Sequence, residues 1–217
     1  MTYSPVDNKT LDLKHTKNII FDLGNVIINL DIAATDIAFR ELFKERYDST
    51  MERLNKMDCF NRYEKGEIDT NTFVENILRS AELKVSKASI LSAWNAMLLD
   101  IPNRRFHILQ EVKKQYRTFC LSNTNDAHIG FINKMLLTTY GIPNLNAYFE
   151  RVYLSHEMGM RKPDVEIFEK VIQDNQLVPQ ETLFIDDTKG HLEGAQKTGL
   201  TTFHMSEQHT LEDLFSY

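Results

Sequence analysis

The stretch NIIFDLGNVI, residues Asn18 to Ile27, decides the fold of this chain. It begins with an apolar run, Ile19 to Phe21, which has the composition of a strand buried on both faces. One carboxylate, Asp22, ends the run, and a Gly-Asn turn signal follows it. Open α/β sheets bind their ligands at the carboxyl ends of their strands, so Asp22 would lie at such an edge. Because a buried unpaired carboxylate is costly, Asp22 needs a cation or hydrogen-bond donors, unless it is only a turn or helix-capping residue.

The chain after this strand divides into a helical block and an alternating block. From about Asp31 to Asn103 apolar residues recur at helical spacing, and the pattern indicates no buried strand. Amphipathic helices are expected there over 33–46, over 51–60, from Asp69 or Thr70, and from Ser86. Beyond this block, strands are expected at 117–121, 151–154, 182–185 and 201–204, and helices at 104–116, 124–137, from Pro163 at a first helical position, 190–198 and 211–215.

Alternating strands and helices indicate a parallel sheet with right-handed crossovers. We therefore predict a Rossmann-like, doubly wound α/β core formed by residues 1–31 and 104–217. Residues 32–103 are expected to form a small helical cap of the four-helix type, inserted after the first strand and lying over the carboxyl edge of the sheet. Residues 1–17 are expected to be a loosely ordered extension.

Composition and charge exclude several classes of function. The net charge is −6 and the basic residues are scattered, so neither nucleic acid nor an anionic membrane is an expected partner. The polar N-terminus lacks the order of a signal peptide, and no apolar stretch is long enough to span a bilayer. The two cysteines, Cys59 and Cys120, do not suggest a disulfide framework, and Cys120 lies in an apolar run typical of a core. A cytoplasmic protein is expected.

Polar residues follow each of the first four predicted strands, and parallel topology brings such residues to one edge. Taken singly, each has an ordinary explanation: a serine caps a helix, a lysine before a proline is solvated, and an Asp-Asp pair lies in a loop. Together, in this order, they predict one pocket that holds Asp22, Ser122, Asn123, Lys162, Asp186 and Asp187.

This set of side chains suits phosphoryl transfer. Asp22 and Asp187 offer the hard oxygen ligands that Mg²⁺ prefers, and Mg²⁺ would neutralise phosphate oxygens. The Ser122 hydroxyl and backbone N–H groups at the next helix start can hold non-bridging oxygens, while Lys162 offsets the crowded negative charge. Asp22 could then attack phosphorus and form an aspartyl-phosphate that water hydrolyses. Receiver domains use a similar set, but there the acidic pair comes first in the chain.

The order and spacing of these motifs resemble the haloacid dehalogenase superfamily from Lys17 onward. The four motifs match residues 21–26, 121–123, 160–164 and 184–187, and the helical insert is similar to the small type-one cap of that superfamily. In detail the motifs, together with the cap stretch Tyr63 to Ile68, resemble the branch that contains bacterial sugar-phosphate phosphatases such as glucose-1-phosphate phosphatase.

The resemblance implies a role for each site residue. Asp22 would be the nucleophile, Ser122 and Asn123 would bind the phosphoryl group, and Lys162 would steady both nucleophile and phosphate. Asp186 would hold Lys162. Mg²⁺ would be bound by Asp22, by Asp187 and by the backbone carbonyl of Gly24. The cap would open and close over the pocket and set specificity.

Two positions depart from the superfamily pattern. Gly24 stands where phosphatases of the superfamily usually carry an aspartate that protonates the leaving alcohol, a contribution of about 10²–10⁴-fold. The sugar-phosphatase branch shows the same glycine. His191 stands where Asp or Asn is usual; an imidazole suits Mg²⁺ poorly, so His191 is either a hydrogen-bonding neighbour of the site or, as we slightly favour, an exposed helix residue.

The leading functional hypothesis is a Mg²⁺-dependent phosphomonoester hydrolase acting on a small phosphorylated metabolite, with a sugar phosphate as the first candidate. A catalytically weak or inactive binding module is the alternative that Gly24 and His191 support. A 2-haloacid dehalogenase is less favoured, because those enzymes work without metal and lack the acidic pair. Cap residues would select the substrate, with Asn29, Asp31, Arg62 and Asn95 as candidates; the oligomeric state stays open.

Overall fold

The computed structural model describes residue 11, residues 13–206 and residues 209–215 of the 217-residue chain. The loosely ordered extension expected over residues 1–17 lies mostly outside these residues. Within them, every helix is too short or too polar to cross a membrane.

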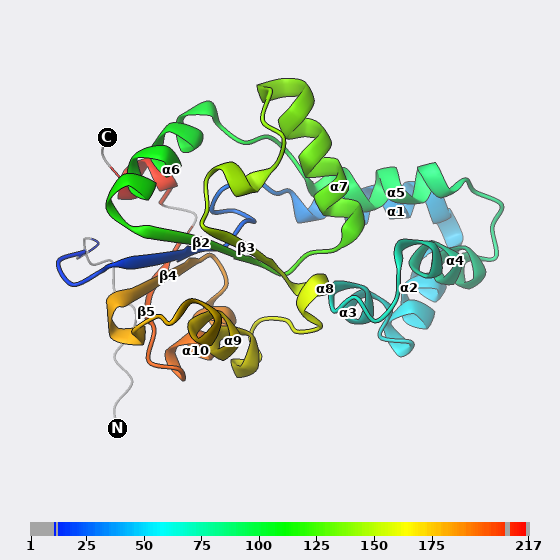
Figure 1. The fold of residues 1–217 in the computed structure, drawn as a ribbon. Coiled ribbons are helices and arrows are strands. Elements are labelled where there is room, and N and C mark those ends of the chain that lie inside the picture. Colours follow the sequence, from blue (N-terminus) through cyan, green and yellow to red (C-terminus); the bar gives the residue numbers. More distant parts are fainter. Residues whose placement is uncertain (1–10, 12, 207–208, 216–217) are drawn as a thin grey trace.

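A parallel five-stranded sheet forms the centre of the molecule, as predicted (Figure 1). Its strands lie in the order β3-β2-β1-β4-β5, so the strand that carries the deciding stretch is central. The register pairs Phe21 with Cys120 on one side and with Ile185 on the other. The strand bounds are β1 Asn18–Phe21, β2 Arg117–Ser122, β3 Arg151–Leu154, β4 Thr182–Asp186 and β5 Thr201–His204.

Helices cover both faces of this sheet, which confirms the doubly wound architecture (Figure 1). Ile19 and Phe21 point to one face and pack in a core with α6, whereas Ile20 points to the other and packs in a core with α9 and α10. This alternation explains why the strand is apolar without interruption. The core helices are α6 Asn103–Gln115, α7 Asp126–Met135, α8 Ser155–Met158, α9 Val165–Asn175, α10 Lys189–Gln196 and α11 Leu211–Leu214.

The insert after β1 is helical and has a core of its own. Aromatic rings fill it: the Phe73 ring lies 4.2 Å from that of Tyr63 and 5.0 Å from that of Trp94. The caps expected from the sequence are present, since Asp69 and Ser86 accept hydrogen bonds from backbone N–H groups three residues on. The helices are α1 Ile32–Phe43, α2 Tyr47–Lys56, α3 Cys59–Glu64, α4 Thr70–Ala81 and α5 Lys87–Trp94.

Two helix boundaries differ from the sequence prediction. The pattern expected over 51–60 belongs to two helices, because Asp58 adopts a left-handed conformation with φ of 50° that ends one helix before the next begins. The insert therefore has five α-helices instead of four. Pro163 does not open α9, which begins at Val165. The backbone of Lys162 is bonded to the side chain of Asn123 on both its N–H and C=O, and this holds the segment before α9 outside the helix.

A short ribbon joins the insert to the core. Leu30 pairs with Leu98 in an antiparallel bridge, and Asn29 exchanges backbone hydrogen bonds with the segment Leu99–Asp100 at 3.0 Å. We propose that this ribbon is the joint between a core of residues 1–31 and 104–217 and a cap of residues 32–103.

The cap also rests on the first turn of α7. The indole Nε1 of Trp94 donates to Asn125 Oδ1 at 3.3 Å, and the indole ring stacks on the His128 ring at 4.9 Å. His128 Nδ1 lies 3.0 Å from Asn95 Oδ1. Burial in this contact disfavours the imidazolium and lowers the pKa of His128 to about 4.

This burial predicts an acid-sensitive contact between cap and core. Unfolded His128 titrates near its ordinary pKa of 6.5 and folded His128 near 4, so between these pH values the unfolded chain binds more protons. Stability from His128 is therefore complete above pH 6.5 and lost as pH falls to 4, by about 3 kcal/mol. Denaturant unfolding from pH 7 to 4 should show a smaller loss for His128→Asn than for the unmodified protein. His107→Asn, at an exposed position, should lose as much stability between pH 7 and 4 as the unmodified protein does. Equal losses in the unmodified protein, His128→Asn and His107→Asn would contradict the prediction.

Candidate active site

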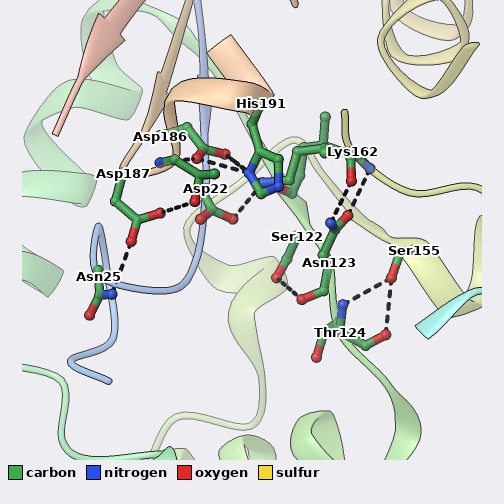
Figure 2. A network of polar contacts seen from close by, with 12 residues as sticks. Asp22, Asn25, Ser122, Asn123, Thr124, Ser155, Lys162, Asp186, Asp187 and His191 are labelled. Carbon is green, nitrogen blue, oxygen red and sulfur yellow. Dashed lines mark hydrogen bonds and ion pairs between the residues drawn. The ribbon is translucent and has the colours of Figure 1, made fainter. Parts of the chain in front are cut away.

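The strand ends bring the predicted side chains together at the carboxyl edge of the sheet (Figure 2). Asp22 follows β1 directly and Asp186 ends β4, and the register of these strands places the two residues side by side. Lys162 reaches them from the loop before α9. Its ammonium donates to Asp22 Oδ1 at 2.8 Å, to Asp186 Oδ2 at 2.7 Å and to the Leu121 carbonyl at 2.9 Å. All three N–H donors of a fully buried lysine are thus directed to fixed acceptors.

Burial and crowding set the charges of this group. Burial raises the pKa of Asp22 to about 7, with repulsion from Asp186 and Asp187 in the same direction, while Lys162 opposes the shift. Burial alone would lower the pKa of Lys162, but attraction to Asp22 and Asp186 outweighs it and raises that pKa above its usual range. Burial would raise the pKa of Asp186 too, yet Lys162 and His191 hold it below its ordinary value. Lys162 and Asp186 are therefore an ion pair, and Asp22 is the carboxylate that needs more positive charge.

The carboxylates form a cluster suited to a divalent cation. Asp22, Asp186 and Asp187 each offer an oxygen, and these atoms lie within 4.8 Å of one another. Three carboxylates against one ammonium leave an excess of two negative charges, and oxygen donors of this kind fit Mg²⁺. Asp187 is oriented by Asn25, whose Nδ2 donates to it at 2.9 Å. The chemistry and charge of the donor set thus fit the predicted cofactor.

Ser122 and Asn123, which follow one another at the end of β2, have different surroundings. Among the described residues, the Ser122 hydroxyl makes only a long contact of 3.4 Å, to the Asn123 carbonyl, so it can take a better acceptor. The Asn123 amide is bound to the backbone of Lys162: Nδ2 donates to the Lys162 carbonyl at 2.8 Å, and Oδ1 accepts from the Lys162 N–H at 2.9 Å. A contact between Asn123 and a phosphoryl group would have to use the second N–H of this amide or the backbone N–H.

His191 is not the exposed helix residue that the sequence slightly favoured. Its side chain is 17% exposed, and Nδ1 lies 3.0 and 3.1 Å from the two carboxylate oxygens of Asp186. The alternative interpretation, a hydrogen-bonding neighbour of the site, is correct. In Figure 2 the ring stands beside Asp186 and the side chain of Lys162.

The Leu30 side chain lies against Gly24, the position of the acid that is missing from the sequence. A Cβ atom at this position would lie 2.6 Å from Leu30 Cδ1, which is too close unless Leu30 moves. Leu30 lies in the ribbon that joins cap and core, so the space next to Gly24 is filled by an apolar side chain.

Contacts from the cap to the site loops were not foreseen from the sequence. The buried Ser155 hydroxyl accepts from the Thr124 N–H at 2.9 Å and donates to the Glu64 carbonyl at 2.6 Å, which joins the cap to the loop after β2. Glu64 also pairs with Arg161 at 2.8 Å, directly before Lys162. Gly66 is the one residue in the sequence that could have pointed to this contact. Its φ is 67°, which favours glycine, and a Cβ atom there would lie 2.0 Å from the His156 carbonyl oxygen.

The four residues considered for specificity, two of them in the cap and two just before it, all have partners within the protein. Asn29 donates to Asp100, Asp31 caps α1, Arg62 pairs with Glu67, and Asn95 contacts His128. Their polar groups serve the structure of the insert and its joint.

Comparisons with known proteins agree with this site. Residues 19–205 match the family model of haloacid dehalogenase-like hydrolases. The chain is 28% identical over 187 residues to D-ribitol-5-phosphate phosphatase of Bacteroides thetaiotaomicron, covering 86% of this chain and 90% of that protein.

Two solved structures show the same fold. An HAD family enzyme from Bacteroides thetaiotaomicron, in complex with magnesium and inorganic phosphate, superposes with a TM-score of 0.79 at 35% identity, covering 87% of this chain and 93% of that one. A predicted HAD-like family hydrolase from Porphyromonas gingivalis has a TM-score of 0.77 at 27% identity, covering 90% and 93%. Together with the four polar strand ends, these matches show that the chain belongs to the haloacid dehalogenase-like hydrolases.

Proposed function

We propose that this protein is a Mg²⁺-dependent phosphomonoester hydrolase that acts on a small phosphorylated metabolite through an aspartyl-phosphate on Asp22. The observation that carries the proposal is the buried group of Asp22, Lys162 and Asp186, with Asp187 beside it. Lys162 fixes the orientation of the nucleophile. The excess negative charge of the three carboxylates is the reason to expect a bound divalent cation. The phosphatase activity of the Bacteroides relative and the magnesium and phosphate bound to the similar enzyme support the same chemistry.

Each residue has a role in binding and attack. Asp22, Asp187 and the Gly24 carbonyl would hold Mg²⁺, which would neutralise the phosphoryl oxygens. The Ser122 hydroxyl and the Asn123 backbone N–H donate to non-bridging oxygens. Asp22 attacks phosphorus, the bond from phosphorus to the ester oxygen breaks, and the phosphoryl group is left on the Asp22 carboxylate. Water then attacks that phosphorus, which releases inorganic phosphate and frees the carboxylate.

The proton for the leaving oxygen has to come from elsewhere than position 24. Gly24 carries no acid, so the leaving oxygen takes its proton from water, and a neighbouring hydroxyl of the substrate can stabilise that oxygen by a hydrogen bond. Polyol and sugar phosphates carry such a hydroxyl. We therefore place a polyol phosphate such as D-ribitol 5-phosphate first among substrates, with sugar phosphates second.

Both described cysteines are buried free thiols, which is consistent with a cytoplasmic setting.

Two other functions are less well supported. A 2-haloacid dehalogenase works without a metal, so it would not need the cluster of Asp22, Asp186 and Asp187, whose negative charge favours a bound cation. A binding module without turnover is favoured only by Gly24, while the directed contacts of Lys162 on the nucleophile are those of a reacting site.

Phosphate release tests this proposal directly. Purified protein would be assayed with D-ribitol 5-phosphate, a panel of sugar phosphates and p-nitrophenyl phosphate, with Mg²⁺ and with EDTA. We expect turnover with Mg²⁺ that falls at least about 100-fold in EDTA and returns when Mg²⁺ is added back, because the cation neutralises the phosphoryl oxygens. Ca²⁺, which takes more ligands at longer distances, should restore little. Metal-independent turnover, or binding of phosphate without turnover of any ester, would refute the proposal.

A further inference from the structure

We infer that His191 is a positioning residue for the reaction: its Nδ1–H fixes the Asp186 carboxylate, and Asp186 in turn fixes Lys162 against the nucleophile. This inference rests on the proposed function and extends it to a residue that departs from the superfamily pattern. The hydrogen bonds that carry it form a chain from His191 through Asp186 and Lys162 to Asp22 (Figure 2).

The contacts of Asp186 settle which ring nitrogen carries a proton. The Asp186 carboxylate is fully buried and accepts from Lys162 Nζ at 2.7 Å and from the Thr188 N–H at 2.8 Å. His191 Nδ1 lies within 3.1 Å of both oxygens. An ionised carboxylate can only accept, so Nδ1 has to donate. In the neutral ring Nε2 is then the bare nitrogen, and His191 acts here as a single, directed N–H donor.

The helix that carries His191 is fixed to the loop that carries Lys162. His191 lies in the first turn of α10, and a Cβ atom at Gly194, one turn later, would lie 2.3 Å from the Pro163 carbonyl oxygen. Backbone therefore packs on backbone where α10 meets the segment after Lys162. Side-chain bonds through Asp186 and this close backbone contact hold α10 and the lysine loop in one arrangement.

The donor matters because Asp186 has no solvent to replace it. When the Nδ1–H is removed, the fully buried carboxylate keeps the Thr188 N–H and Lys162 but loses the donor that lies against both of its oxygens, so its orientation is held less firmly. Lys162, which binds that carboxylate, would then be held less firmly against Asp22. Neither His191 nor Asp186 is assigned to the leaving group, so the loss should fall on kcat and leave KM largely unchanged.

Three substitutions distinguish the contribution of an N–H donor at Nδ1 from that of one at Nε2. His191→Asn places an amide N–H where Nδ1 lies, His191→Gln places one where Nε2 lies, and His191→Leu has no donor. We expect His191→Asn to keep kcat within about threefold, and the other two to lower kcat about tenfold at unchanged KM. His107→Leu, at an exposed position, is the control for the substitution itself. Full activity in all three variants, or activity in His191→Gln but not in His191→Asn, would overturn the inference.

A second measurement does not depend on activity. The ¹⁵N shifts of the His191 ring, assigned by comparison with His191→Leu, should show a protonated Nδ1. If no ester is turned over, the proposed function fails while this measurement still decides the contact. A ring protonated on Nε2 alone would overturn the inference whatever the activity.

Discussion

The Asp22→Asn protein is expected to fold normally and to lose phosphatase activity by at least about 10⁴-fold. An amide cannot attack phosphorus, and no other carboxylate is held on Lys162 in the same place: the second acceptor, Asp186, is engaged by three donors. The measurement is phosphate release under single-turnover and steady-state conditions, with the aspartyl-phosphate trapped by acid quench. Phosphorylated protein should be found for the unmodified chain and not for the variant.

The stability of the same variant distinguishes lost chemistry from lost fold. The pKa of Asp22 is raised from 3.8 to about 7, so the ionised carboxylate destabilises the metal-free fold; the loss begins above pH 3.8 and is complete once pH has passed 7. Removing the charge should therefore leave the free energy of unfolding at pH 8 unchanged or higher when no Mg²⁺ is added. Asp48→Asn, at a side chain that is 94% exposed, is the matched control and should change neither activity nor stability. Residual turnover by Asp22→Asn within 100-fold of the unmodified protein would show that Asp22 is not the nucleophile.

Much of the site could be predicted because parallel topology turns sequence order into spatial position. Every strand of the sheet runs in the same direction, so the residue after each buried run has to lie at one edge. Asp22 and Asp186 needed only that rule, since each follows an apolar run directly. Lys162 was placed by the same rule although it lies eight residues beyond the end of β3, in a loop, and the resemblance added its expected contact with Asp186. Its burial among acceptors confirms that placement.

The rest depended on contacts that periodicity does not record. A helical pattern assigns His191 to a face of α10, but in the first turn a side chain can reach back to the strand end before the helix, and only the coordinates show that it does. Asn123 follows a serine in a motif, and nothing in that motif says that its amide binds the backbone of residue 162. The division at Asp58 is equally local: one left-handed residue splits a continuous apolar pattern into two helices.

The cap contacts change how the missing acid at Gly24 is understood. From the sequence alone, Gly24 is an absence that weakens a phosphatase. In the structure the neighbouring space is taken by Leu30, whose backbone belongs to the joint between cap and core. The glycine thus lets the Leu30 side chain pack close to the backbone next to the nucleophile.

Lys162→Met is expected to abolish activity and to destabilise the fold by about 3–5 kcal/mol, because it leaves Asp22 and Asp186 buried without their shared cation. Methionine has nearly the volume of the lysine stem, so the loss comes from charge and not from a cavity. Phosphate release should fall about 10³-fold or more, since a preorganised positive charge next to the reacting group is removed. Urea unfolding at pH 8 measures the stability. Lys170→Met, on the exposed face of α9, is the matched control and should behave as the unmodified protein within about 0.5 kcal/mol.

The double variant Lys162→Met/Asp186→Asn separates the two effects. Lys162→Met leaves two buried carboxylates unpaired, and neutralising Asp186 as well removes the share of the penalty that belongs to Asp186. Part of the lost stability should therefore return in the double variant, while activity should not, because Asp22 still lacks the ammonium that orients it. If activity returned together with stability, Lys162 would serve only to balance the charge of Asp186. If neither returned, the destabilisation would come from the backbone of the loop before α9, and the ion pair would not be what holds Lys162 in place.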